Sequence, residues 1–187
     1  MTIAWNVIEV FVTIGLGIAA GSLALVAFGL DSIVEILAST VVLWHLRGSG
    51  TRPGDHGTEE VRRTRRALRL VAVAFFALAA ILLAGATRDL VTGREAGESP
   101  FGIAYLGVTA IVMFSLAFAK RRTSVVLDNH PLEHEARITF LDGLLATGIV
   151  LALAANVAFG WWWADPLAAA VVGLAAISEG INAPREH

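Results

Sequence analysis

Acidic side chains inside long apolar segments are the clearest indication of function in this sequence. Glu9, Asp31, Glu35 and Asp142 each lie in such a segment. Burying an ionised carboxylate at mid-bilayer depth costs at least about 2.5–3.5 kcal/mol. No lysine or arginine lies deep in these segments, so protons or a bound cation must neutralise the acids.

The spacing of these residues predicts that several share one small volume. Asp31 and Glu35 are four residues apart and project from one helix face, and Asn6 and Glu9, three apart, also share a face. A tight turn near Gly21 would fold both segments into a hairpin. At about 1.5 Å per residue, Asp31, Glu9 and Glu35 lie roughly 14, 18 and 20 Å from that turn. One hairpin thus offers three carboxylates and an amide at similar depth.

Such a cluster predicts exchange of metal ions for protons. Like charges at low dielectric favour protonated carboxyl groups, and a divalent cation would displace those protons. Metal binding is then linked to proton release. The alternative is that the acids stay protonated and only hydrogen-bond the helices together.

The elements that must position these residues are transmembrane helices. Of 187 residues, 56% are hydrophobic and 16% charged, whereas soluble domains are about 45–50% apolar and about 25% charged. A spanning helix needs about 20 mainly apolar residues. The segments that qualify are 3–20, 23–46, 67–86, 101–119, 138–159 and 166–181. We therefore predict an all-α integral membrane protein with six transmembrane helices.

The domain expected is a single six-helix unit over 1–187, with loops at about 47–66 and 120–137 and no soluble C-terminal domain. All basic residues except Arg88 and Arg94 lie in those loops, their flanks or the C-terminal tail. The positive-inside rule then places both termini in the cytoplasm, in a multi-pass protein of the cell (inner) membrane. The net charge of -2 gives no reason to expect a nucleic-acid partner, and the absence of cysteine excludes thiolate sites.

Helix starts and close helix contacts are also predicted from the sequence. Ser99 and Asp165 each precede a proline, which is typical of an N-cap followed by the first helical residue. Asp165 is therefore interpreted as the cap of the sixth helix and not as a ligand. Gly15, Gly17 and Gly21 would let the first two helices approach closely.

Three stretches resemble the cation diffusion facilitator family of transporters. The second segment reads GSLAL at 21–25 and GLDSIVE at 29–35, similar to the family's second helix, where a small-residue turn precedes two acids four apart. EARITFLD at 135–142 resembles the start of its fifth helix, and WADPLA at 163–168 the start of its last. The resemblance implies a divalent-cation efflux transporter that works by alternating access as a homodimer. It implies Zn²⁺ first, with Cd²⁺, Mn²⁺, Fe²⁺ or Co²⁺ open, proton coupling, and no resident cofactor.

The resemblance also implies a ligand set. Three of the family's four metal ligands fall on Asp31, Glu35 and Asp142. The fourth position, usually histidine, is Ile138, so Glu9 or Asn6 is expected to supply the missing ligand. A site without imidazole is harder, which weakens strict selectivity for zinc. We also expect the family's usual cytoplasmic metal-binding domain to be missing, as in a short, domain-lacking branch.

Asp142 raises a question of depth. Counted from Gly160, it lies roughly 27 Å from the outer turn, nearer the cytoplasm than Asp31. Either the fifth helix extends beyond the bilayer, or Asp142 joins the site only part of the time.

A second group of metal-binding residue types lies between the fourth and fifth segments. It contains Asp128, His130, His134 and Glu135. His130 and His134, four apart, could chelate a metal if this stretch is helical, although Pro131 disfavours a regular turn. We favour a hydrated polar loop, and the alternative is a secondary cytoplasmic metal site.

Two other classes of function were weighed against transport. Asp31 and Asp142 could form the like-charged dyad of an intramembrane aspartyl protease, but Glu35 would then have no role. A membrane protein that binds metal without moving it is also compatible with the sequence. We expect a transporter and not an enzyme.

Overall fold

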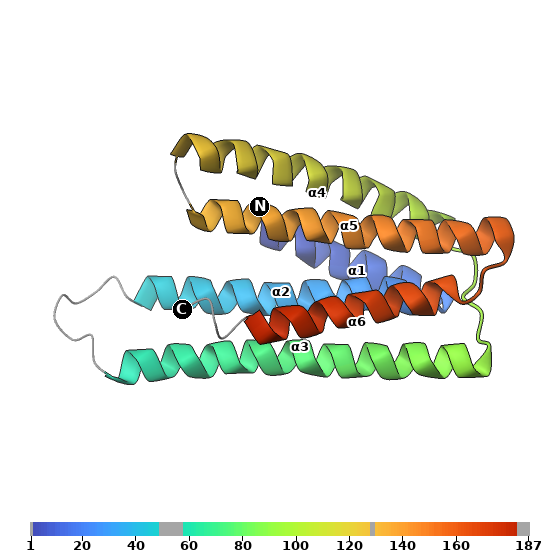
Figure 1. Ribbon diagram of the computed structural model, residues 1–187, viewed down its shortest axis with the longest axis horizontal. Coiled ribbons are helices and arrows are strands. Elements are labelled where there is room, and N and C mark those ends of the chain that lie inside the picture. Colours follow the sequence, from blue (N-terminus) through green and yellow to red (C-terminus); the bar gives the residue numbers. More distant parts are fainter. Residues whose placement is uncertain (1, 49–57, 128–129, 183–187) are drawn as a thin grey trace.

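The computed structural model describes the backbone of residues 2–48, 58–127 and 130–182, and side chains over a narrower set that omits, among others, 2–5, 41–48 and 58–65. Within these ranges the chain is helical and contains no strand. The helices are α1 (Thr2–Ala20), α2 (Leu23–Gly48), α3 (Thr58–Thr92), α4 (Pro100–Leu127), α5 (His130–Phe159) and α6 (Ala164–Asn182). The predicted all-α fold with six helices is confirmed (Figure 1).

Several helices have the length and composition needed to cross a membrane. In the described part of the chain, four segments are long and apolar enough: Leu68–Thr92, Pro100–Val126, Ala136–Phe159 and Ala164–Asn182. A shorter apolar helix covers Asn6–Ala20. Large apolar side chains point outward on several helices, as at Phe11 and Phe118, which suits contact with lipid.

The helices extend further than the sequence predicted. The expected loops 47–66 and 120–137 are helical except at 49–57 and 128–129, which lie outside the described residues. Arginine and glutamate, which recur in these extensions, are good helix formers. Pro131 lies in the first turn of α5, where a missing N–H costs little. The helices α3, α4 and α5 have 35, 28 and 30 residues, more than the roughly 20 that a bilayer requires.

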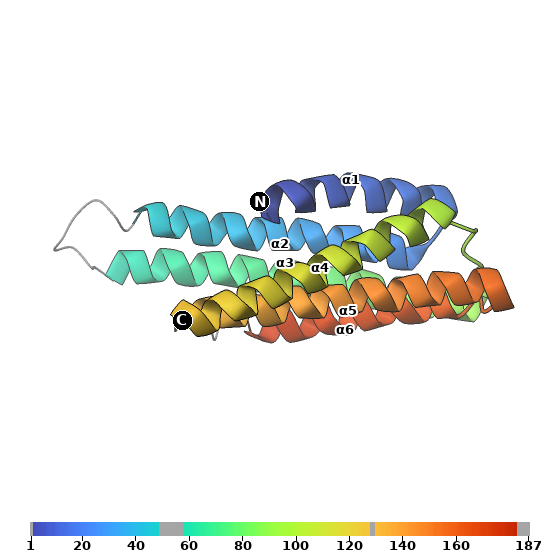
Figure 2. The same cartoon turned by 90° about the horizontal axis from the view of Figure 1, so that it is seen from above.

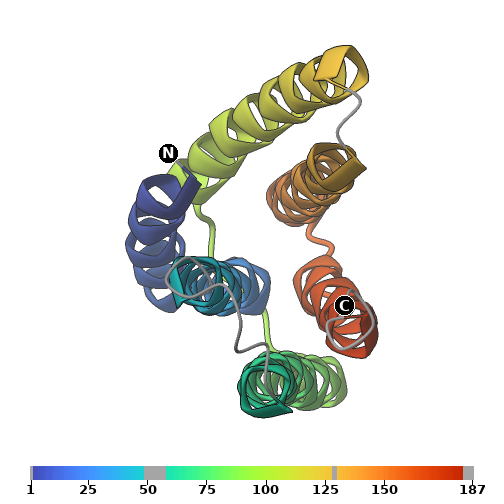
Figure 3. The same cartoon turned by 90° about the vertical axis from the view of Figure 1, so that its left-hand side faces the viewer.

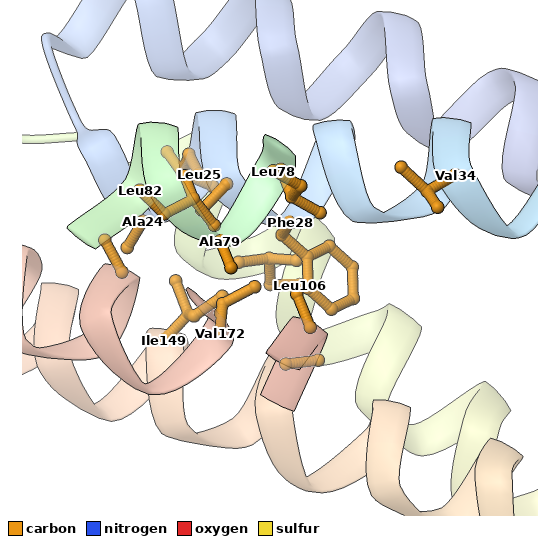
Figure 4. Close-up of a cluster of buried hydrophobic side chains, with 14 of the residues drawn as sticks. Ala24, Leu25, Phe28, Val34, Leu78, Ala79, Leu82, Leu106, Ile149 and Val172 are labelled. Atoms are coloured by element: carbon orange, nitrogen blue, oxygen red, sulfur yellow. The ribbon is translucent and has the colours of Figure 1, made fainter. Parts of the chain in front are cut away.

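The six helices form an up-and-down bundle in which some pairs pack much more closely than others. The most extensive contacts join α4 with α5, α3 with α6 and α1 with α2. The α4–α5 hairpin touches α1 and α2 at few points and joins the rest mainly through α6, and Figures 2 and 3 show α4 inclined to its neighbours. Fully buried side chains from five helices fill the centre (Figure 4): Leu25, Leu82, Leu106, Ile149 and Val172. The α4–α5 hairpin is therefore the most loosely attached part of the bundle.

Glycines bring α1 and α2 into close contact. A Cβ atom added at Gly17 would lie 2.7 Å from Val26 Cγ2 and 2.8 Å from Val26 N, and one at Gly29 would lie 2.5 Å from Thr13 Oγ1. Gly21 forms the turn between the helices with a φ of 64°. The close approach predicted at Gly17 is confirmed, whereas Gly15 has nothing within 4 Å of an added Cβ and is not part of it.

One end of the bundle, here called the turn end, carries the α1–α2, α3–α4 and α5–α6 connections. Asp165 Oδ2 accepts a hydrogen bond from the backbone N–H of Leu23 at 2.8 Å, and the Ser22 hydroxyl donates to Asp165 Oδ1. The N–H of Gly97 donates to the carbonyl of Ala20 at 2.7 Å. These bonds tie all three connections together.

Asp165 thus differs from its predicted role. Helix α6 begins at Ala164, and the Asp165 carboxylate caps α2, a helix more than 140 residues earlier in the chain, instead of its own helix. It acts as a cap, as expected, but the sequence cannot reveal a cap between distant helices. Ser99 acts as predicted, because its hydroxyl accepts from the N–H of Gly102 at 3.2 Å in the first turn of α4.

Replacing Gly17 by alanine should destabilise the protein. The added methyl group meets backbone and side-chain atoms of Val26, and such overpacking costs about 1–3 kcal/mol. Gly15→Ala is the matched control on the same helix, because it has open space and gains helix propensity of about 1 kcal/mol. Thermal unfolding in detergent should give a lower midpoint for Gly17→Ala only, and equal midpoints would contradict this packing.

Replacing Asp165 by alanine should also destabilise the protein. The change leaves the Ser22 hydroxyl and two N–H groups of α2 without their acceptor, at a cost of about 1–3 kcal/mol. Asp165→Asn retains an acceptor oxygen and should lose less. A thermal midpoint for Asp165→Ala equal to that of the wild type would show that this cap does not hold the turn end together.

Candidate metal site

A polar stripe on α1 faces α2 in the middle of the bundle. Asn6 Nδ2 donates a hydrogen bond to Glu35 Oε2 at 3.0 Å, and the Ser32 hydroxyl donates to Glu9 Oε2 at 3.1 Å. Asn6 and Glu9 are buried, with 4% and 2% of their surface exposed. The two helices leave the same turn and pack closely at Gly17, so residues at equal distances from the turn meet, as residue counting predicted.

Helix α5 brings a further carboxyl group to this position. The carboxyl groups of Glu35 and Asp142 lie within hydrogen-bonding reach of one another. Both side chains are half-buried, and they come from different hairpins. The pair therefore joins the α1–α2 hairpin to the α4–α5 hairpin.

The depth question for Asp142 is answered by the offset of α5. Helix α5 extends past the ends of α1 and α2 at the turn end (Figure 1). The α5–α6 turn therefore lies further out than the α1–α2 turn (Figure 1). For this reason Asp142 lies at the level of Glu35, although more residues separate it from the α5–α6 turn than separate Glu35 from the α1–α2 turn.

Two more acids surround the pair at longer range. Asp31 lies within electrostatic range of Glu35, one turn along α2, and of Glu179 on α6. Glu179 also interacts with Asp142. The acidic group therefore draws on α2, α5 and α6, with Glu9 of α1 beside it.

The set of acids predicted from the sequence does not include Glu179. It lies three residues after Ala176 and seven after Val172, both buried, and this spacing places it on the core-facing stripe of α6. Helical periodicity carried to the last turns of the sixth segment would have identified it.

The acids approach one another without forming a complete metal site among the described residues. No three histidine, aspartate or glutamate side chains among the described residues meet closely enough to hold a metal ion. Glu35 and Asp142 form a pair, and Asp31, Glu9 and Glu179 lie around it at electrostatic range. Ile138, one turn before Asp142, is half-buried and offers no donor atom. That Asp31, Glu35, Asp142, Glu9 and Asn6 bind a metal stays a prediction.

An apolar cavity between α5 and α6 does not coincide with the acids. It has a volume of about 320 Å³ and lies between α5 and α6 near the turn end, lined only by apolar residues such as Leu144, Leu167 and Trp163. It offers no oxygen donor from a charged group and does not suit a cation.

The secondary metal site predicted between the fourth and fifth segments is not tested. His130, His134 and Glu135 lie on the helical backbone of α5, but their side chains and the whole of Asp128 fall outside the described residues. The described neighbour Glu133 accepts a hydrogen bond from Arg137 at 3.0 Å and forms an exposed ion pair with it.

Comparison with known proteins agrees with these features. The cation efflux transmembrane domain matches residues 1–186. The chain belongs to the cation efflux family. A protein of Synechocystis sp. described as an uncharacterized transporter is 26% identical over 180 residues, which are 93% of this chain and 58% of that relative. The cation efflux chain thus spans little more than half the length of this curated relative.

Family membership confirms the resemblance seen in the sequence motifs. This cation efflux protein is a multi-pass integral membrane protein of a family that transports metal cations. Its acids meet inside the bundle, and metal cations are the cargo of the family. The group around Glu35 and Asp142 is therefore the candidate metal site.

Removing either member of the central pair should weaken metal binding. In Glu35→Gln and Asp142→Asn the shape of the side chain is kept and one negative charge is lost. A ligand at about 100 times its Kd stabilises a protein by about 2.7 kcal/mol. Zn²⁺ or Cd²⁺ should therefore raise the thermal midpoint of the wild type. The same metal should raise the midpoints of the two variants by less than half as much. Glu98→Gln, an exposed acid in the α3–α4 connection, is the control. A full metal-induced shift in both variants would remove the pair from the site.

Proposed function

We propose that this cation efflux protein moves divalent metal ions, Zn²⁺ first, out of the cytoplasm in exchange for protons. The observation that carries the proposal is the meeting of Glu35 and Asp142, from two separate hairpins, inside a bundle of apolar helices. Two carboxyl groups in that position require a positive partner, since burial of uncompensated charge is costly. A divalent cation and protons are alternative partners for the same oxygens.

The bound state needs only movements of side chains and small movements of helices. Asp31 is one turn from Glu35, so a change of side-chain rotamer brings both carboxylates to one ion. Glu179 approaches from α6 and takes the place left by Ile138. Asn6 keeps Glu35 oriented through its amide, while Glu9 lines the site.

Charge counting predicts how protons accompany the metal. Asp31, Glu35, Asp142 and Glu179 together would carry four negative charges, twice the charge of a divalent cation. Part of the group therefore keeps its protons when the metal binds, and the rest release theirs. This partial release is the basis of metal/proton antiport.

The donor set favours a broad choice of metal. Carboxylate oxygens suit harder cations, and the absence of imidazole at 138 removes the ligand that most favours zinc. Zn²⁺ stays the first candidate because of the family resemblance, and Cd²⁺, Mn²⁺, Fe²⁺ and Co²⁺ are alternatives.

The loose attachment of the α4–α5 hairpin supports alternating access. Glu35 lies in the α1–α2 hairpin and Asp142 in the α4–α5 hairpin, and these hairpins share few contacts. A movement of one against the other would separate the two carboxyl groups and open the site. The homodimer, the inner-membrane location and the cytoplasmic position of both termini are carried over from the resemblance and from the basic residues of the α2–α3 and α4–α5 connections.

An aspartyl protease is disfavoured by the pairing of the acids. A protease dyad needs two aspartates that share one proton, whereas the partner of Asp142 is Glu35. Asp31 stands further away, within electrostatic range only.

Transport should require both Asp31 and Asp142. Purified protein in liposomes with a transmembrane pH gradient should accumulate Zn²⁺, followed with an enclosed fluorescent indicator, and Asp31→Ala or Asp142→Ala should abolish the flux. Glu95→Gln, an exposed acid far from the site, should transport normally. Unchanged flux in both alanine variants would overturn the proposal, and metal binding without any flux would indicate a non-transporting metal-binding protein.

A further inference from the structure

One threonine in the bundle, Thr109, differs from most of the helical hydroxyls. A hydroxyl in a helix commonly donates to the carbonyl four residues earlier. In the described part of the chain this bond is made by Thr13, Ser32, Thr40, Thr87, Thr92, Ser115, Thr123 and Thr147. Thr109 on α4 is 0% exposed, and its hydroxyl does not make this bond to its own helix. Its hydroxyl is therefore available to a group outside its own helix.

The group that Thr109 faces is Glu9. Thr109 lies close enough to interact with Glu9 of α1 and with Tyr105, one turn earlier on α4. Glu9 Oε1 and the Tyr105 hydroxyl are also buried and without a hydrogen-bond partner among the described residues. Buried polar atoms are nearly always paired in proteins, so these three atoms are the hydrogen-bonding groups at this contact that can still bond one another.

We propose that Thr109, with Tyr105 behind it, is a positioning residue for Glu9. The Thr109 hydroxyl donates to Glu9 Oε1, and the Tyr105 hydroxyl donates to Thr109 Oγ1. Ser32 already donates to Glu9 Oε2, so both oxygens of Glu9 are then fixed from two helices. Rotation of the Thr109 side chain between staggered rotamers suffices to form the first bond.

The position of Glu9 matters because of its neighbours. Glu9 lies within electrostatic range of Asp31, Glu35 and Asp142, and of Tyr105 on α4. A carboxyl group held there adds to the attraction for a cation at the central pair, whereas one free to turn away adds less. The inference rests on the proposed transport function, to which it adds α4 as a determinant of cation affinity.

The contact also joins parts of the bundle that otherwise touch little. Helix α1 meets α4 at few points. The contact of Glu9 with Thr109 is a polar interaction between these two helices. When the α4–α5 hairpin moves against α1 and α2, this contact and the Glu35–Asp142 pair change together. Formation of the hydroxyl bonds is thereby linked to the state of the metal site.

The test compares three variants in the liposome assay. Thr109→Val keeps the shape of the side chain without the hydroxyl and should raise the KM for Zn²⁺ about tenfold, the effect of one hydrogen bond, with little change in the maximal rate. Thr109→Ser restores a hydroxyl and should restore the KM. Thr147→Val removes a hydroxyl that bonds only its own helix and should leave the KM unchanged. An unchanged KM in Thr109→Val, or a KM in Thr109→Ser as high as in Thr109→Val, would overturn the proposal.

A double-mutant cycle separates positioning from simple packing. If Thr109 acts through Glu9, Thr109→Val should have little further effect on KM in a Glu9→Gln background. Additive effects would overturn the proposal. Thermal unfolding of the wild type, the two single variants and the double variant measures the coupling between Thr109 and Glu9 without any transport. This measurement therefore still tests the Thr109–Glu9 contact if the wild type moves no metal and the proposed function fails.

Discussion

The structure depends on one electrostatic constraint, which is that acids stand inside apolar helices with no deep basic residue to balance them. An uncompensated carboxylate is too costly at mid-bilayer depth, so each acid must be protonated, hydrogen-bonded or paired with a cation. Polar neighbours meet part of this need, because Asn6 donates to Glu35 and Ser32 donates to Glu9. The bond from Asn6 reaches one member of the Glu35–Asp142 pair, Glu35. The Glu35–Asp142 pair therefore needs a positive charge or a proton as well. The same constraint explains why the acids point inward: the outer faces of these helices carry large apolar side chains.

The bundle combines a fixed end with a more loosely joined region. At the turn end, Asp165 of α6 caps α2, and the α3–α4 connection is bonded both to α1, through Ala20, and to α5, since Asn156 Nδ2 donates to the carbonyl of Ala96 at 2.9 Å. Further along the bundle, the α4–α5 hairpin meets α1 and α2 at few points, and two of these points are polar: Glu35 with Asp142, and Glu9 with Thr109. A hairpin held at one end and joined by titratable or hydroxyl groups further along can tilt about the held end.

Much of the fold follows from the sequence, and less of the site does. Apolar runs of spanning length predicted all six helices. Residue counts from Gly21 predicted that Glu9 of α1, with Asn6 on the same face, would lie at a depth similar to that of Asp31 and Glu35 of α2. Helix ends were underestimated because charged residues outside the hydrocarbon region still favour helix. The partner of Asp165 could not be predicted, since a cap between α6 and α2 depends on how distant helices pack. Glu179 was recoverable from periodicity, whereas the unpaired Thr109 hydroxyl depends on a rotamer that no sequence pattern determines.

Helix α6 connects these observations. This helix of 19 residues carries Asp165 at the turn end and Glu179 beside the acidic group. A cation that draws Glu179 toward Asp31 and Asp142 therefore pulls on the same helix that caps α2, and α6 packs against α2, α3 and α5. The chain has isoleucine where its family usually has a histidine on the fifth helix, so a ligand supplied by α6 would shift the force of metal binding from α5 alone to both α5 and α6. The loss of one imidazole would then change which helices respond to the ion, as well as how hard the site is.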